Sequence, residues 1–392
     1  MQYREIKKLN AKISTFGMGC MRLPFEAGSN GDPGRIDEPL ATRMVHHAID
    51  HGVNYIDTAY VYHSERSEEV LGKALQQGGY RHKTWVATKF PAYKMVYHRY
   101  DELKANPAVV VERIIDEQLR KLRTDCIEMY LIHNLEKRRW PALQAVGMLD
   151  ILQTMQAKGK IRYIGFSFHD SYELFTQIID AFAWDMCQIQ LNILDQEFQA
   201  GVAGLQYAGS KGIPVTIMEP LRGGSLVQNI PEEIQKLWDH YEPHRSVVDW
   251  CFRWVCNFPE VMTVLSGVST MGQTHQNVQL FDTMLPNSMT PAELELVCQV
   301  REQYQKRIKV TCTNCGYCLP CPAGVQIPKI FQTYNNTSMF NNRYRGRKEY
   351  TAFQANQTDA SRCVRCGKCE SHCPQGIPVM EQLRQASAFL TE

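Results

Sequence analysis

The chain has 392 residues, 44% of them hydrophobic, and a formal net charge of +2. This length accommodates one large domain of about 250–300 residues and a smaller one. The nearly balanced charge argues against a nucleic-acid or membrane-surface partner. No apolar run is long enough to span a bilayer, and the first residues lack the apolar core of a signal peptide. We therefore expect a cytoplasmic protein without a nucleic-acid or membrane partner.

Short apolar runs alternate with helical patterns over most of the chain. This alternation predicts a parallel sheet with helices outside it. The candidate strands are 16–21, 55–57, 85–89, 126–133, 163–167, 186–190, 214–218 and 261–266. Eight strands favour a closed (β/α)8 TIM barrel over an open doubly wound sheet. A short hairpin, 3–9 with 12–14, is expected to precede the barrel.

Several helices carry recognisable boundary signals. Asn106 and Pro107 suit the N-cap and the first position of a helix. Gly159 and Gly212 can end two other helices because glycine adopts the left-handed conformation without strain.

The barrel pattern fades before residue 290, where a new helix is expected. Thr290 suits the cap of a helix over 291–307. We predict a barrel domain over residues 1–288, a connecting helix over 289–308, and a small α-helical ferredoxin-like domain over 309–392.

Two short blocks hold eight of the 14 cysteines. They are Cys312, Cys315, Cys318 and Cys321, followed by Pro, and Cys363, Cys366, Cys369 and Cys373, also followed by Pro. This pattern is typical of two 4Fe–4S clusters, in which three closely spaced cysteines bind one cluster and the fourth binds the other. Zinc remains an alternative for paired Cys-x-x-Cys motifs. Disulfides are disfavoured in a long chain without a secretory segment.

The first cysteine block departs from the usual ferredoxin spacing. Cys318 and Cys321 are separated by one residue fewer than Cys369 and Cys373. Whether Cys321 is a cluster ligand is therefore left open.

Four reactive side chains stand near the ends of successive predicted strands. Asp57 ends the second strand, Lys89 the third and His133 the fourth, and Tyr62 follows Asp57 in the loop. The carboxyl ends of barrel strands share one mouth, where barrel enzymes carry out their chemistry. Each residue alone is more often structural, but the four together indicate a catalytic site.

Three further motifs, at 17–24, 57–72 and 159–167, complete a resemblance to a known family. They resemble the aldo-keto reductases, most closely those predicted oxidoreductases that carry a C-terminal ferredoxin-type domain. The resemblance covers residues 10–285. It implies a barrel that reduces a carbonyl, or oxidises an alcohol, with a nicotinamide cofactor.

The resemblance also implies that Asp57, Tyr62, Lys89 and His133 form a catalytic tetrad. A tyrosine with its ordinary pKa of about 10 is a weak acid at neutral pH. We expect the Lys89 cation to lower the pKa of Tyr62. Asp57 can hold the ammonium in place, and His133 can donate a hydrogen bond to the substrate oxygen.

The resemblance implies a cofactor site built from several loops. Its expected residues are Met21, Arg22, Ser167, Gln190, Glu219, Leu221, Arg222, Gly223, Ser269, Gln273, Gln276 and Asn277. Ser167 and Gln190 are expected to hold the nicotinamide carboxamide, and the loop with Arg222 suits a pyrophosphate. The 266–277 loop lacks the Lys or Arg that meets a 2′-phosphate, so the choice between NADP and NAD stays open.

The substrate pocket is expected from loops after the early strands. The loops at 22–32, 90–100 and 134–140 hold Phe25, Tyr93, Tyr97, His98 and Trp140. These aromatic side chains suit stacking on a ring or a sugar, or simple packing.

The two ends of the chain use different electron chemistry. A nicotinamide passes two electrons as hydride, whereas a 4Fe–4S cluster passes one at a time, so a flavin between them is left open. The first hypothesis is a nicotinamide-dependent oxidoreductase whose clusters have an added electron-transfer or structural role. The alternative is an electron-transfer enzyme that passes electrons from a ferredoxin or flavodoxin carrier through the clusters to a bound flavin or substrate. A third is an assembly subunit that has lost catalysis.

A local basic run lies between the two cysteine blocks. Arg343, Arg345, Arg347 and Lys348 are expected in a short loop. The favoured interpretation is that these cations offset the negative clusters or face solvent. A docking patch for an acidic carrier is the alternative.

Overall fold

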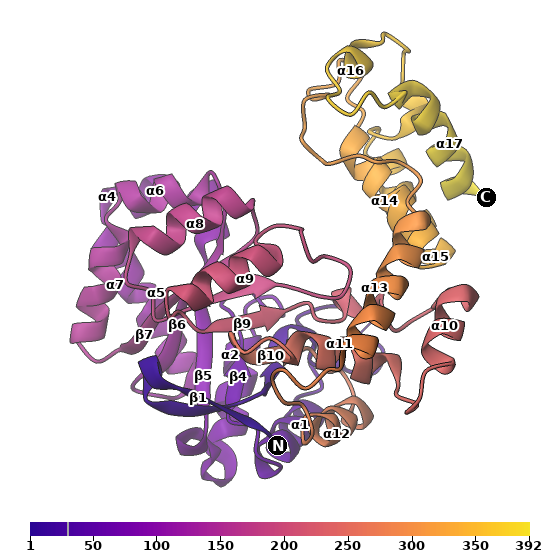
Figure 1. The fold of residues 1–392 in the computed structure, drawn as a ribbon. Coiled ribbons are helices and arrows are strands. Elements are labelled where there is room, and N and C mark those ends of the chain that lie inside the picture. The colour runs from indigo at the N-terminus through magenta and orange to yellow at the C-terminus, as the bar shows by residue number, and fades with distance from the viewer. Residues whose placement is uncertain (30) are drawn as a thin grey trace. The chain divides into compact units, whose positions relative to one another are not determined.

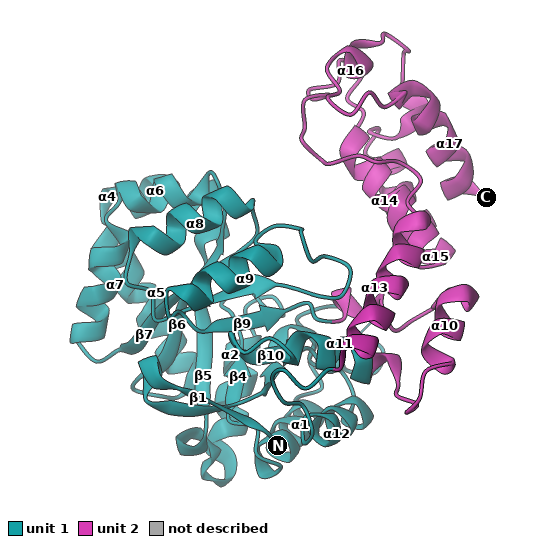
Figure 2. Ribbon diagram, viewed as in Figure 1, with its two compact units in different colours: residues 1–220, 249–289 teal, residues 221–248, 290–392 magenta. Residues whose placement is uncertain are grey.

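The structure is a computed structural model that describes residues 1–29 and 31–392. The chain forms two compact units, coloured separately in Figure 2. Unit 1 comprises Met1–Pro220 and Asp249–Met289, and unit 2 comprises Leu221–Val248 and Thr290–Glu392. A segment inside the predicted barrel domain, Leu221–Val248, therefore groups with the cysteine-rich part of the chain.

Unit 1 is built on a closed barrel of eight parallel strands, in the order β10-β3-β4-β5-β6-β7-β8-β9 (Figure 1). The strands are β3 (Phe16–Gly19), β4 (Tyr55–Asp57), β5 (Trp85–Phe90), β6 (Ile127–Leu135), β7 (Ile161–Phe168), β8 (Met186–Gln190), β9 (Val215–Met218) and β10 (Val261–Ser266). The predicted TIM-barrel fold is confirmed.

The barrel strands are buried along nearly their whole length. Every residue of β4, β8 and β10 is buried, as expected for parallel strands covered on both faces. The predicted 16–21 strand is too long, because Cys20–Arg22 forms a 3₁₀ turn after β3.

Helices connect the strands and surround the barrel. They are α1 (Glu38–Asp50), α2 (Ser67–Gln76), α3 (Ala92–His98), α4 (Tyr100–Ala105), α5 (Pro107–Leu122), α6 (Arg139–Ala145), α7 (Met148–Ala157), α8 (Tyr172–Ala181), α9 (Gly201–Ser210), α11 (Val247–Cys256) and α12 (Met271–Leu280). In α5, Pro107 stands at the first position and Val111, Ile115 and Leu122 are buried on the inner face, as the sequence pattern predicts.

A hairpin closes the N-terminal end of the barrel. Strands β1 (Tyr3–Ile6) and β2 (Ala11–Ser14) pair antiparallel. Leu9 and Ile13 are buried in one cluster with the barrel residues Tyr55, Met129 and Met186. The opposite end, where Asp57, Lys89 and His133 stand, is left as the mouth.

Unit 2 is helical. Its helices are α10 (Glu232–Asp239), α13 (Pro291–Lys306), α14 (Ile327–Met339), α15 (Arg343–Ala355), α16 (Lys368–Ser371) and α17 (Val379–Thr391). α13 begins with a capping box, in which the Thr290 side chain accepts from the Glu293 N–H and the Glu293 carboxylate accepts from the Thr290 N–H. This matches the connecting helix expected over 291–307.

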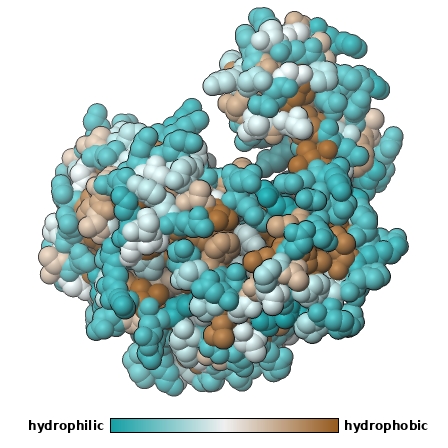
Figure 3. Space-filling view, viewed as in Figure 1, coloured by the Kyte–Doolittle hydropathy of each residue, from teal (hydrophilic) through white to brown (hydrophobic). Residues whose placement is uncertain are grey.

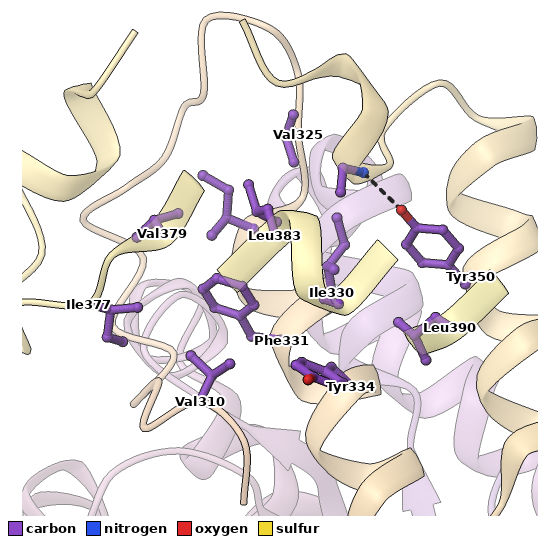
Figure 4. Packing of buried hydrophobic residues seen from close by; sticks show 13 residues of the cluster. Val310, Val325, Ile330, Phe331, Tyr334, Tyr350, Ile377, Val379, Leu383 and Leu390 are labelled. Atoms are coloured by element: carbon purple, nitrogen blue, oxygen red, sulfur yellow. Dashed lines mark hydrogen bonds between the residues drawn. The ribbon is translucent and has the colours of Figure 1, made fainter. Parts of the chain in front are cut away.

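The small hydrophobic core of unit 2 gathers residues from α14, α17 and the loops (Figure 4). Ile330 and Phe331 of α14 are buried together with Leu383 of α17. The Tyr350 hydroxyl accepts a hydrogen bond from the Ala360 N–H at 3.3 Å. Six of the eight block cysteines pack against this core, which therefore supports the cysteine loops directly.

The basic run is helical, so its expected loop conformation is wrong. Arg343 begins α15, and the Asn342 side chain caps the helix by accepting from the Arg345 N–H at 3.0 Å. A Cβ on Gly346 would lie 2.1 Å from the Thr337 hydroxyl. Close packing of α15 against α14 therefore requires glycine at this position.

The surface of each unit is mainly hydrophilic on the face seen in Figure 3, with hydrophobic residues in small groups. Among the described residues, no helix combines the length and the apolar character needed to cross a membrane.

Candidate functional site

A buried ion pair links the ends of β4 and β5. The Lys89 ammonium donates to both carboxylate oxygens of Asp57, at 2.7 and 2.8 Å, and to the Thr58 carbonyl at 2.7 Å. Lys89 has no exposed surface and Asp57 is 2% exposed. Three short hydrogen bonds fix the cation in one position.

Tyr62 and His133 lie against this ion pair. The Lys89 ammonium lies 5.0 Å from the centroid of the Tyr62 ring. The rings of Tyr62 and His133 meet edge to face, with centroids 5.9 Å apart. The structure therefore brings together all four residues that the sequence placed at the barrel mouth.

Burial controls the protonation of Tyr62. It raises the pKa of Tyr62 above its ordinary value, and the opposing effect of the Lys89 cation is smaller. The prediction of a lowered pKa for Tyr62 is therefore wrong in its net direction, because it left out the cost of burying a phenolate. Tyr62 stays protonated at neutral pH and is a hydrogen-bond donor.

The pKa values of Lys89 and His133 are shifted in opposite directions. Burial acts to lower the pKa of Lys89, but the Asp57 carboxylate and Tyr62 outweigh it and raise that pKa. Burial, with the cations of Lys89 and Arg139 and the neighbouring His169, holds the pKa of His133 well below its ordinary value. The site at neutral pH thus pairs an ammonium with a neutral imidazole.

The loop after β4 fixes the position of Tyr62. His63, Ser64 and Glu65 have φ values of 51°, 52° and 70°, which are uncommon for residues with a Cβ. The buried His63 ring donates through Nδ1 to the Pro33 carbonyl and accepts from the Leu23 N–H, both at 3.0 Å. These two bonds hold the loop in its left-handed conformation.

A second buried polar network supports β5 from outside the barrel, and the sequence reasoning missed it. The Glu68 carboxylate of α2 accepts from the Thr88 hydroxyl at 2.6 Å and from the Gln118 amide at 2.7 Å. The same amide lies 3.2 Å from the Lys89 carbonyl, and the Tyr130 hydroxyl donates to the Gln118 carbonyl oxygen. The only sequence signal was a glutamate on the apolar face of an amphipathic helix.

A cavity of about 400 Å³ opens beside the tetrad. Its lining includes His133, Tyr93 and His98. Arg139 stacks on Tyr93, with its guanidinium carbon 5.7 Å from the ring centroid. Trp140, also expected here, is buried against Trp184 and is absent from the lining.

The expected carboxamide-binding residues lie at the ends of β7 and β8. The Ser167 hydroxyl accepts from the Asn134 N–H at 2.7 Å. The Gln190 amide donates to Asp195 at 3.1 Å, and Asn192 donates to the same carboxylate oxygen. The Ser167 hydroxyl can still donate, and the Gln190 carbonyl can still accept, which is the set of groups that a carboxamide needs.

Arg22 and the loop after β10 lie side by side. A Cβ on Gly267 would meet the Arg22 side chain at 3.2 Å, so that side chain lies flat on the glycine. The Ser269 hydroxyl donates to the Arg22 carbonyl at 2.9 Å, and the Gln273 side chain accepts from the Ser269 N–H. Met21 is 59% exposed beside them.

The last two expected residues of this loop differ in exposure. Gln276 is exposed on α12, whereas Asn277 is buried and donates to the Ser266 hydroxyl at 3.0 Å. Asn277 therefore links α12 to the end of β10.

The glycine-containing loop after β9 crosses the boundary between the two units. The part in unit 1 ends at Pro220 and includes Glu219, which has a φ of 57° and whose carbonyl accepts from Asn192 at 3.3 Å. Leu221, Arg222 and Gly223 belong to unit 2. The Arg222 guanidinium stacks on Phe340 there, 5.0 Å from the ring centroid.

The block cysteines surround two cavities in unit 2. Cys312, Cys315 and Cys318 line the first cavity with Cys373. Cys363, Cys366 and Cys369 line the second with Cys321, and Cys318 also borders it. Each cavity thus combines three cysteines of one block with the last cysteine of the other, despite the shorter Cys318–Cys321 spacing.

The cysteine loops present backbone as well as sulfur to these cavities. Gly316 and Gly367, each directly after the second cysteine of its block, have φ values of 80° and 73°. Burial raises the pKa of the Cys312 thiol, which also accepts a backbone hydrogen bond from Asn314. Backbone N–H groups directed at sulfur are a common feature of iron–sulfur sites.

The thiols suit a cluster better than a single ion. Within residues 1–29 and 31–392, no three His, Cys, Asp or Glu side chains converge as ligands of one metal ion. The thiols stand instead around two voids, four at the first and five at the second, where Cys318 is shared. Each void therefore has the four thiols that a 4Fe–4S cluster requires.

Comparison with known proteins decides the family. A sequence model of the Aldo/keto reductase family matches residues 16–292. The chain belongs to this family. A second model, of a 4Fe-4S dicluster domain, matches residues 311–377 of this aldo/keto reductase. Both parts of the resemblance drawn from the sequence are confirmed.

Curated relatives of this aldo/keto reductase are distant. Aldo-keto reductase YhdN of Bacillus subtilis (strain 168) is 25% identical over 307 residues, which is 70% of this chain and 86% of the relative. The uncharacterized oxidoreductase YrpG of the same organism is 24% identical and covers 73% of this chain and 92% of the relative.

Solved structures share the fold. The holo form of aldo-keto reductase AKR11C1 from Bacillus halodurans superposes with a TM-score of 0.62 at 23% identity, covering 76% of this chain and 96% of that one. An aldo-keto reductase from Klebsiella pneumoniae in complex with NADPH gives a TM-score of 0.58 at 20% identity, covering 76% and 95%.

Proposed function

We propose that this protein interconverts a small-molecule carbonyl and the corresponding alcohol with NADP or NAD at the barrel mouth. The observation that carries the proposal is the Lys89 ammonium, held by Asp57 and lying 5.0 Å from the Tyr62 ring centroid. A lysine, an acid and a phenol buried together suit proton transfer to a carbonyl oxygen.

Each member of the tetrad has a distinct role in the proposal. Tyr62 gives its proton to the substrate oxygen in reduction and takes it back in oxidation. Lys89 stabilises the phenolate that forms, and Asp57 keeps Lys89 charged and in place. Neutral His133 donates a hydrogen bond that orients the carbonyl.

A bound nicotinamide dinucleotide supplies or accepts the hydride. Ser167 and Gln190 are assigned to its carboxamide because their remaining donor and acceptor are complementary to it. Arg22 and Ser269, which contact each other, are assigned to the adenosine end with Met21, Gln273, Gln276 and Asn277. Glu219, Leu221, Arg222 and Gly223 are assigned to the pyrophosphate loop. NADPH in the Klebsiella pneumoniae relative supports this cofactor class, and no reported match supports a flavin.

For the C-terminal domain we propose two 4Fe–4S clusters. One is held by Cys312, Cys315, Cys318 and Cys373, and the other by Cys363, Cys366, Cys369 and Cys321. The support is the grouping of these thiols around two cavities. On this proposal the barrel domain spans 1–288, the linking helix 289–308 and the cluster domain 309–392.

A second candidate function is electron transfer from a one-electron carrier protein through the clusters. It is favoured by two cations, Arg365 and Lys368, that line the second cavity. Direct passage of single electrons to a hydride carrier is chemically awkward, so the first function is preferred.

The test is anaerobic purification, followed by iron and sulfide assay, a visible spectrum and identification of any released nucleotide. Carbonyl-dependent oxidation of NADPH and NADH is then compared between the wild type and Tyr62→Phe. The matched control is Tyr93→Phe, which removes a hydroxyl at the cavity without touching the ion pair. Loss of turnover in Tyr62→Phe but not in Tyr93→Phe supports the proposal. Equal rates in the two variants would overturn it.

A further inference from the structure

The two thiol cavities differ sharply in charge. Apart from the thiols, every side chain that lines the first cavity is uncharged. The second cavity is lined by Arg365 and Lys368, with His372 beside them. Both cavities are open to solvent to a similar degree, since Cys315 of one and Cys366 of the other are exposed.

The cations at the second cavity are available for a partner. In the part of the chain that the structure describes, neither Arg365 nor Lys368 takes part in a side-chain ion pair or hydrogen bond. Glu370, the nearest acid in sequence, accepts from the Met380 N–H at 2.9 Å. Glu381, which lies in the field of Arg365, is paired with Arg384.

Exposed apolar side chains line the same cavity as these cations and the thiols. Val364 stands between Cys363 and Cys366 and is 68% exposed, and Tyr317 is 66% exposed. With Leu319, both line the second cavity. Exposed apolar side chains next to cations, at a cavity lined by redox ligands, are the pattern of a surface that binds a charged partner briefly.

The basic run on α15 does not share these properties. The Arg343 guanidinium stacks on Phe389 at 3.6 Å and donates to its carbonyl, and Arg345 is paired with Glu349. Arg347 and Lys348 are exposed, but α15 lines neither cavity. The sequence hypothesis of a docking patch therefore moves from α15 to the loop of the second cysteine block.

We infer that the surface formed by Tyr317, Leu319, Val364, Arg365 and Lys368 is the docking site for an acidic one-electron carrier protein. The inference rests on the proposed presence of clusters in unit 2. Carboxylates of the carrier would pair with Arg365 and Lys368, and its apolar contact residues would cover Val364 and Tyr317. The cluster held by Cys321, Cys363, Cys366 and Cys369 is then the entry point for electrons.

The redox step at this surface is simple. A cluster held by Cys321, Cys363, Cys366 and Cys369 would accept one electron from the reduced carrier. The carrier would be oxidised by one electron and the cluster reduced by one, with no bond or proton exchanged. The surface contributes proximity and charge attraction, which accelerate encounter and weaken as salt rises.

The experiment measures cluster reduction in the full-length, cluster-loaded protein by anaerobic stopped-flow. The probe is a reduced acidic 2Fe–2S ferredoxin. The readout is visible absorbance at a wavelength where oxidised and reduced ferredoxin absorb equally, so that the change reports reduction of the 4Fe–4S clusters. The test variant is Arg365→Glu/Lys368→Glu. The control, Arg347→Glu/Lys348→Glu, makes the same charge change on α15. Photoreduced deazariboflavin, a neutral reductant, and an iron assay report whether the clusters themselves are intact.

We expect the second-order rate constant with ferredoxin to fall about tenfold or more in Arg365→Glu/Lys368→Glu. It should change less than about twofold in the α15 control, and the wild-type rate should fall as salt rises. If charge reversal disturbs cluster assembly, Arg365→Gln/Lys368→Gln is used instead. It should also be reduced by ferredoxin more slowly than the α15 control. Equal slowing of both Glu variants would overturn the docking site while leaving the clusters in place. Reduction of the wild-type protein by deazaflavin but not by ferredoxin would overturn the docking site too, and absence of iron from the wild type would overturn the cluster proposal itself.

Discussion

Lys89 donates hydrogen bonds to both carboxylate oxygens of Asp57 inside the barrel, at 2.7 and 2.8 Å. A buried ion pair adds little stability as such, because desolvation of the two charges offsets their attraction. Its effect here is to keep a cation beside Tyr62. The arrangement of side chains at the barrel mouth therefore depends on this ion pair. Removal of either partner alone would leave the other as an uncompensated buried charge and would destabilise the fold.

Removal of one partner should destabilise the barrel. We expect Asp57→Asn to lower the free energy of unfolding by about 3–5 kcal/mol, because the ammonium loses its counter-charge, and to lower turnover at least about 100-fold. The double variant Asp57→Leu/Lys89→Met should recover most of the stability and none of the activity. Urea unfolding of the barrel and carbonyl turnover measure the two effects. An active double variant would contradict the role of the pair.

The pH profile should reflect the raised pKa of Tyr62. Tyr62 donates only while protonated, so the single-turnover rate of carbonyl reduction should stay level through neutral pH. It should fall as the pH rises above the ordinary tyrosine value of about 10. Alcohol oxidation, which needs the phenolate as base, should rise over the same range. A reductive rate that halves near neutrality would show that another group donates the proton.

The Glu68 network should contribute to both stability and position. Glu68→Ala leaves the Thr88 hydroxyl and the Gln118 amide without their acceptor, and should lower the free energy of unfolding by about 2–4 kcal/mol. Glu68→Gln, which retains one carbonyl oxygen for both donors, should lose less. Burial raises the pKa of Glu68, so the folded state holds its proton more firmly than the unfolded state. The stability that this raised pKa contributes should therefore be fully present below about pH 4.5, the ordinary pKa of a glutamate. It should be lost as the pH rises through the pKa of Glu68 in the folded state. Suppose that Glu68→Gln and wild type had equal free energies of unfolding in acid, and that Glu68→Gln were no more stable than wild type at neutral pH. This account of Glu68 would then fail.

The grouping of thiols predicts which cluster depends on which distant cysteine. Cys321→Ser should deplete the cluster held by Cys363, Cys366 and Cys369, and Cys373→Ser the other one. Each variant should lose up to about half of the iron, with a different spectroscopic signal remaining in each. Iron assay and electron paramagnetic resonance of the dithionite-reduced proteins check this. Full iron content in Cys321→Ser would mean that Cys321 is not a ligand. The matched control is Cys298→Ser, which changes an exposed cysteine outside both cavities.

Strand positions could be predicted because buried parallel strands are short, nearly continuous apolar runs. The strands at Tyr55–Asp57, Met186–Gln190 and Val261–Ser266 have the predicted bounds. Since the strand ends meet at one mouth, the proximity of Asp57, Lys89 and His133 followed from the strand positions alone.

Other features depend on packing that a linear pattern does not contain. The position of Glu68 on the apolar face of its helix indicates burial, but nothing in the sequence shows that its carboxylate meets Thr88 and Gln118. The net pKa of Tyr62 depends on how much water its loop excludes, which only the folded loop determines. The run from Arg343 to Lys348 is polar and contains a glycine, so it resembles a loop until Gly346 is seen packed against Thr337.

The central claim is that the buried tetrad transfers a proton to a carbonyl while a nicotinamide supplies hydride. The most direct measurement is single-turnover oxidation of bound NADPH or NADH by a panel of small aldehydes and ketones, in wild type and in Tyr62→Phe. We predict carbonyl-dependent oxidation in the wild type, with unchanged nucleotide affinity and at least about a 100-fold lower rate in Tyr62→Phe. Equal rates in the two proteins, or no nucleotide binding by the wild type, would contradict the account.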